Sequence, residues 1–130
     1  MFIKAMELHE EGTEHWADSA ASAFDLLRLD DCDDGPKPEW WNDEALKALS
    51  ARVVSLAPCK AQPCAMRADV LCGDALGLAS WNAGPRTAAE IKEAATWYRR
   101  ASMATHTTND KICFEALERA CDEVADPLVA

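Results

Sequence analysis

The stretch from residue 87 to residue 101 reads TAAEIKEAATWYRRA, and it decides the fold class of the chain. Thr87 and Glu90 have the T-x-x-E spacing of a capping box, in which two side chains satisfy the first backbone amides of a helix. Apolar residues then recur at intervals of three and four: Ile91, Ala94, Ala95, Tyr98 and Ala101. This spacing places them on one helix face, so the stretch predicts a helix with one buried side.

The same spacing continues on both sides of this stretch. A helix is expected after Thr107-Thr108-Asn109-Asp110, ended by Asp126-Pro127, with apolar positions at Cys113, Leu117, Ala120, Cys121 and Val124. Another is expected to begin near Gln62 and Pro63, where a proline suits the first turn. Its apolar positions are Ala65, Ala68, Leu71, Cys72, Ala75 and Leu76.

Three more helices are expected nearer the N-terminus. One runs from about residue 41 to residue 56, where Ala57-Pro58 stops it, with a stripe of Leu46, Leu49, Val53 and Leu56. The helix before it can be capped by Thr13, and its apolar positions are Trp16, Ala20, Ala23, Phe24 and Leu27. A short helix from Phe2 to Glu11 ends at Gly12, and the acidic stretch 30–39, DDCDDGPKPE, predicts a loop.

The whole chain therefore predicts a single all-α domain over residues 1–130, with five to six antiparallel helices joined by mostly short turns. No stretch alternates apolar and polar residues as a strand does. No apolar run approaches the roughly 20 residues of a membrane span. The N-terminus, MFIKAMELHEEG, lacks the apolar core of a secretory signal, so an intracellular protein is expected, cytoplasmic by default and with an organelle left open.

Two segments carry a family resemblance. Ala94-x3-Tyr98-x2-Ala101 and residues 51–58, ARVVSLAP, resemble the second helix of a tetratricopeptide repeat, in which small residues flank an aromatic ring at a helix seam. The resemblance covers about residues 45–125. It implies a TPR-like right-handed stack of helices with a concave groove for a peptide or protein partner, and an irregular helical bundle is the alternative.

Charge narrows the class of partner. The net charge is −10, and residues 1–44 hold 13 acids and three bases, whereas residues 45–130 hold ten of each. Such a chain repels a phosphate backbone, so nucleic acid is not an expected partner. An acidic surface favours and steers a partner with a basic surface.

Aromatic and basic residues supply the candidate partner-binding positions. Trp40, Trp41 and Trp81 lie in or beside predicted loops, and tryptophan is enriched at binding hot spots. Arg99 and Arg100, directly after Tyr98, join them as candidates. The alternative for the tryptophans is that they fold back and cover the helix ends.

Metal and catalytic patterns are weak. Asp30, Asp34 and Gly35 match three positions of a calcium loop, but the third and twelfth positions do not. Cys59-x4-Cys64 lacks the tighter C-x2-C spacing of many zinc sites, and His106, seven residues before Cys113, is a loose candidate. No hydrolase, phosphate-loop or metalloprotease motif is present. We therefore expect no cofactor and no catalytic or metal-binding residue. The six cysteines are expected to be reduced, with the Cys64/Cys72 and Cys113/Cys121 pairs in the core.

Together these observations predict a non-catalytic interaction module, a TPR-like adaptor or scaffold that binds a protein or peptide. A small structural subunit embedded in a larger complex is the first alternative. An enzyme or a metal-binding protein is the second.

Overall fold

The protein is all-helical over the residues described by a computed structural model, which are 13–29, 41–76, 81 and 83–129. Five helices and no strand occur in these ranges: α2 (Glu14–Leu29), α3 (Asp43–Leu56), α4 (Ala61–Cys72), α5 (Ala88–Ala104) and α6 (Thr108–Val129). The expected helix at residues 2–11 and the expected loop at residues 30–39 lie outside the described ranges. The all-α prediction is confirmed for the described residues.

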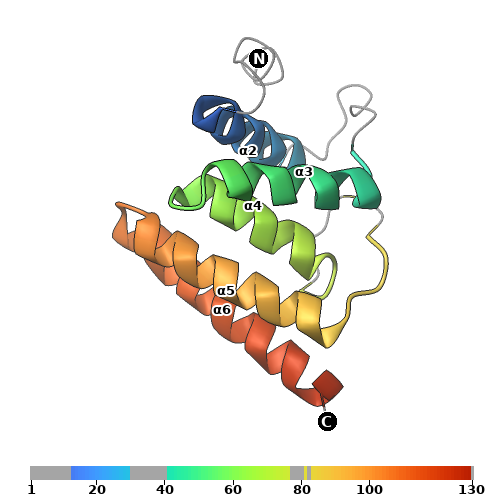
Figure 1. The fold of residues 1–130 in the computed structure, drawn as a ribbon. Helices are drawn as coiled ribbons and strands as arrows, with labels where there is room; N and C mark the ends of the chain where they lie inside the picture. The colour runs from blue at the N-terminus through green and yellow to red at the C-terminus, as the bar shows by residue number, and fades with distance from the viewer. Residues whose placement is uncertain (1–12, 30–40, 77–80, 82, 130) are drawn as a thin grey trace.

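Successive helices lie side by side from α2 to α6 (Figure 1). Helix α4 is central, because its two faces enter two separate apolar clusters. Met66 and Val70 pack with residues of α2 and α3, whereas Ala68, Leu71 and Cys72 pack with residues of α5 and α6. The position of α4 thus depends on packing from both sides.

Most of the predicted helix starts are confirmed. The Thr13 hydroxyl accepts a hydrogen bond from the amide of Trp16 at 3.1 Å, at the start of α2. Both halves of the Thr87–Glu90 capping box form at the start of α5. Pro63 falls in the first turn of α4, where its missing amide costs no helical hydrogen bond.

Two predicted helix ends are wrong. Helix α4 stops at Cys72 and does not reach Leu76, because Gly73 follows with φ of +56°, a conformation that glycine adopts without steric strain. Helix α6 does not stop before Asp126-Pro127 but continues to Val129. A proline removes one backbone hydrogen bond, and in the last turn of a long helix this loss is small enough for the helix to continue.

The alanine-flanked tyrosine of α5 lies at a helix seam, as the sequence predicts. Tyr98 is buried together with Ala94 and Ala101, which leave room for its ring. The ring stacks on Phe114 of α6 with a centroid distance of 6.4 Å. Its hydroxyl donates a hydrogen bond to the Asp69 carboxylate of α4. Tyr98 therefore joins three helices, and burial raises the pKa of its hydroxyl, which stays protonated.

Arg86 fastens the segment before α5 to two other helices. Its side chain is only 2% exposed, and it binds the Asp43 carboxylate with Nη2–Oδ1 and Nη1–Oδ2 distances of 2.6 and 3.1 Å. It also donates to the carbonyls of Leu71 and Val70 at the end of α4. The Val70 carbonyl accepts a second hydrogen bond from the Gly73 amide. Gly73 makes this approach possible, because a Cβ atom there would lie 2.8 Å from the guanidinium.

Asp43 makes the stability of the fold depend on pH in the acid range. Its pKa is held at about 2, below the ordinary 3.8, chiefly by the hydrogen bond from Arg86 and further by those from Trp81 and Gly84. Because the folded-state pKa is the lower one, this stabilisation is complete above about pH 5 and is lost as the pH falls toward 2. We expect the free energy of unfolding, measured by urea titration, to fall across this window.

The matched variant Asp43→Asn should lose less stability over the same pH window, because it has no carboxylate at this position. Glu90 also has a lowered pKa, chiefly because it accepts a hydrogen bond from the Thr87 amide, and this contribution is present in both proteins. Parallel curves for the two proteins would contradict the role given to Asp43.

Candidate functional site

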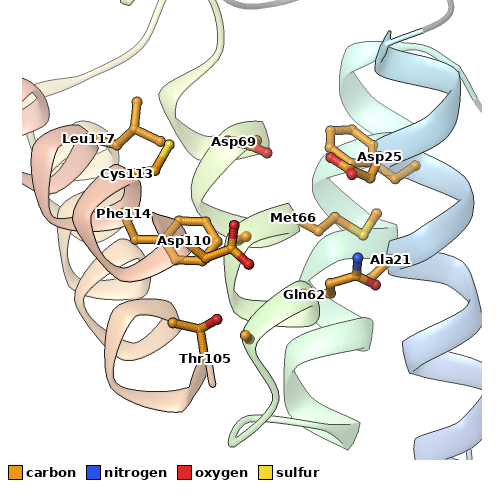
Figure 2. Close-up of a pocket in the computed structure, with 13 residues that line it drawn as sticks. Ala21, Asp25, Gln62, Met66, Asp69, Thr105, Asp110, Cys113, Phe114 and Leu117 are labelled. Atoms are coloured by element: carbon orange, nitrogen blue, oxygen red, sulfur yellow. The ribbon is translucent and has the colours of Figure 1, made fainter. Parts of the chain in front are cut away.

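A groove of about 550 Å³ opens across α2, α4 and α6. Figure 2 shows α6 as one wall, α2 as the opposite wall, and α4 between them. Thr105, in the turn between α5 and α6, closes part of the rim. The groove therefore exists only because three helices that are separate in sequence are stacked beside one another.

The base of the groove is largely apolar. Phe24 comes from α2, Met66 from α4, and Phe114 and Leu117 from α6. Alanines at 21, 61 and 65 keep the space between these larger side chains open. A surface of this kind gains free energy when another apolar side chain displaces water from it.

Three carboxylates project into the same groove, one from each wall and one from the base. These are Asp25 of α2, Asp69 of α4 and Asp110 of α6 (Figure 2). No lysine, arginine or histidine is found among the described residues that line the groove. The described lining thus carries acidic side chains and no basic one, which favours a cationic ligand.

The walls of the groove also carry a hydrogen bond between α2 and α4 and an exposed thiol on α6. The Ser22 hydroxyl of α2 donates to the Gln62 amide oxygen of α4 at 2.7 Å and ties one wall to the base. Cys113 on the α6 wall carries an exposed thiol, contrary to the prediction that it lies in the core. Its α6 face turns toward the groove, whereas Cys121, eight residues later, is buried against α4 and α5.

The predicted tryptophan positions do not line this groove. Trp40 lies outside the described residues. Trp81 is 9% exposed and packs edge-on against Phe24, with a centroid distance of 5.9 Å, while its indole N–H donates to Asp43 at 3.0 Å. Trp41 is half-buried and lies against the same two rings. Trp41 and Trp81 thus fold back onto the helices, as the alternative prediction had it. They pack against Phe24 of α2, and Trp81 also binds Asp43 at the start of α3.

Arg99 and Arg100 are exposed on α5 and also lie away from the groove. Arg99 pairs with Glu118 of α6, with an Nε–Oε2 distance of 3.6 Å. The Arg100 guanidinium lies 4.7 Å from the Trp97 ring centroid. The structure therefore does not bring the candidate arginines together with the candidate tryptophans.

Metal-ligating residues do not converge in the described ranges. No group of three or more histidine, cysteine, aspartate or glutamate side chains there could hold a metal ion. This includes Cys59, Cys64 and His106. The calcium-loop candidates Asp30, Asp34 and Gly35 lie outside those ranges. None of the helices in the described ranges is long and apolar enough to cross a bilayer.

The sequence analysis missed the residues of the groove. A usable pattern was present in α6, because Asp110, Cys113, Phe114 and Leu117 are spaced at three and four and so share a face. Phe114 and Leu117 also pack against the core cluster that contains Cys121, so the groove side of α6 and its core side form one broad apolar face. The spacing alone does not show where the covered part of that face ends.

The comparisons with known proteins add no relative. No protein-family model matches the chain, no curated protein matches its sequence, and no solved structure matches its fold.

Proposed function

We propose that this protein is a non-catalytic interaction module that binds a basic, partly apolar segment of another protein in the groove between α2 and α6. The observation that carries the proposal is the combination of an apolar base with carboxylates from three helices and no cation among the described lining residues. The expected TPR-like stack, with a peptide held on its concave side, agrees with this choice of surface.

The chemistry of the groove favours a peptide over a small polar ligand. A partner with lysine or arginine beside apolar side chains would place the cations near Asp25 and Asp110 and the apolar groups near Met66 and Phe114. Burial of the apolar groups supplies affinity, and the opposite charges supply orientation and a faster encounter. Such binding weakens as salt is added, because exposed charges are screened.

The cysteines provide a direct test. Cys113 lies in the groove and Cys59 lies in the turn before α4, and both thiols are exposed. We expect a designed amphipathic peptide of leucine and lysine to slow maleimide labelling of Cys113 while labelling of Cys59 is unchanged. The same peptide with glutamate in place of lysine should protect neither thiol. Equal protection of both thiols, or protection by the acidic peptide, would contradict the proposal.

A matched pair of variants separates the groove from the overall charge. Asp110→Lys adds a cation at the groove, whereas Asp74→Lys makes the same change at an exposed position that does not line it. We expect Asp110→Lys to weaken binding of the basic peptide by about fivefold or more, on the scale of one lost charge pair. Asp74→Lys should change it less than about twofold. If both variants weaken binding equally, only the net charge matters and the groove is not the site.

Two exposed apolar side chains are the observation that favours the alternative, a structural subunit embedded in a larger complex. Met103 and Ile112, near the turn between α5 and α6, are 77% and 58% exposed. Single exposed apolar residues are ordinary on soluble proteins, so the peptide-binding module remains the better supported function. The intracellular location stays a prediction.

A further inference from the structure

Two buried thiols meet between α4 and α6. The Cys121 thiol points at the sulfur of Cys72, with an Sγ–Sγ distance of 3.9 Å. Cys72 is 2% exposed and Cys121 is fully buried. They belong to the same apolar cluster, beside Ala68 and Leu71. The two residues are 49 apart in sequence, so only the tertiary fold brings them together.

The separation is within reach of a covalent bond. A disulfide requires a sulfur–sulfur distance near 2.05 Å, so the two sulfurs have to approach by rotation of their side chains together with a small shift of α6. Cys72 is the last residue of α4, and Gly73 follows it. Cys121 lies on α6, which packs extensively only against α5 among the described helices. Arg86 holds the end of α4, so α6 is the helix that is free to shift at this contact.

The environment also assigns different roles to the two thiols. The hydrogen bond from Cys121 lowers the pKa of Cys72, and the Arg86 guanidinium acts in the same direction, whereas burial and Asp69 act against them. The same hydrogen bond raises the pKa of Cys121. Because the thiolate is the attacking species in disulfide exchange and the Cys121 thiol donates to the Cys72 sulfur, the contact favours Cys72 as the nucleophile and Cys121 as the resolving thiol.

We propose that Cys72 and Cys121 are a dithiol site that a small-molecule disulfide such as oxidised glutathione converts to an intramolecular disulfide. Cys72 attacks one sulfur of the reagent, breaks its S–S bond and releases one glutathione thiolate, which takes up the proton lost by Cys72. Cys121 then loses its proton and attacks the Cys72 sulfur of the mixed disulfide, which releases the second glutathione. Two protein thiols are oxidised and one disulfide is reduced to two thiols.

The bond would fix α6 to α4 at the end of the groove. Asp69 and Leu117 line the groove one helical turn before Cys72 and Cys121, respectively. Oxidation would therefore set the spacing between the base and one wall of the groove. The reagent reaches the buried pair by local opening of α6. Among the described helices α6 packs extensively against α5 alone, and such a helix opens at a lower free energy than one packed on both sides.

Peptide mapping of the native, full-length chain gives a direct test. Trypsin cleaves after Arg67, Arg86 and Arg119, so residues 68–86 and residues 120–130 form peptides that each contain one cysteine. After incubation with oxidised glutathione and blocking of the remaining thiols, we expect these two peptides to be linked. The link should vanish on reduction. The exposed Cys59 and Cys113 should carry glutathione or remain blocked.

A stability measurement provides the second readout. A disulfide that closes a loop of this length restricts the unfolded chain, so the oxidised protein should melt about 5 °C or more above the reduced protein. Cys121→Ala should abolish this rise, whereas the control Cys59→Ala should keep it. The proposal fails if the linked peptide is absent while Cys59 and Cys113 are modified. It also fails if the link forms only in urea, or if Cys72 pairs with a different cysteine such as Cys32.

Discussion

Tyr98→Ala is expected to lower the free energy of unfolding by about 3–5 kcal/mol, the range seen when a buried aromatic ring is removed. Tyr98 is one of the largest fully buried side chains, and its loss would leave a cavity where α4, α5 and α6 meet. Ala94 and Ala101 on either side are too small to fill that cavity. The Asp69 carboxylate would also lose its hydroxyl donor.

Urea unfolding followed by circular dichroism measures this change, with two variants for comparison. Tyr98→Phe keeps the ring and removes only the hydrogen bond, so its cost should be about 1–3 kcal/mol. Thr96→Ala, at an exposed position on the same helix, should stay within about 0.5 kcal/mol of the parent. A cost for Tyr98→Ala as small as that of Thr96→Ala would show that the ring is not a seam residue. The packing basis of the repeat resemblance would then be lost.

Arg86→Met should destabilise the protein by a similar amount, about 3–5 kcal/mol. The variant leaves the partly buried Asp43 carboxylate without its guanidinium partner, and it removes one hydrogen-bond donor each from the carbonyls of Val70 and Leu71. Removing one member of a buried ion pair is costly because the other charge remains out of water.

The contrasting substitution is Lys47→Met, which removes the other cation near Asp43. The Lys47 ammonium lies 3.9 Å from the same carboxylate and 3.1 Å from Glu90, but its side chain is 36% exposed. Solvent screens such pairs, so the expected cost is at most about 1 kcal/mol. Both variants can be measured by the same urea titrations. Equal costs for Lys47→Met and Arg86→Met would contradict the view that burial, and not charge alone, makes Arg86 important.

A double variant with Arg86→Met and Asp43→Leu tests the same point from the other side. Because no charge is then left uncompensated, we expect it to be more stable than Arg86→Met alone. If the two costs simply add, the two side chains act independently and the described ion pair contributes nothing to the fold.

Local sequence patterns were sufficient where a helix depends on its own residues. The capping box at Thr87 and Glu90, the cap at Thr13 and the apolar spacing around Tyr98 all predict what the structure contains. Capping and amphipathic spacing act within one or two turns, so the information they need is contained in a short stretch. The two wrong helix ends lie where the outcome depends on a single residue, Gly73 or Pro127.

The sequence predicted the burial of single residues less well than it predicted the helices, because burial depends on the whole fold. Trp81 follows a loop-like stretch and yet packs with Phe24, which is far from it in sequence. Cys113 and Cys121 lie on the same helix, but one thiol is exposed in the groove and the other is buried against Cys72. The spacing of residues along one helix does not show which of its faces another helix will cover.

The helical character of the described residues, the start of most helices and the buried face of α5 can all be read from short stretches of sequence, because they depend on neighbouring residues. Three further features come from the packing of whole helices: three aspartates share one groove, Arg86 joins α3 to the end of α4, and Cys72 meets Cys121. These placements follow from how whole helices stack, and the free energy of stacking is summed over many contacts between residues distant in the chain.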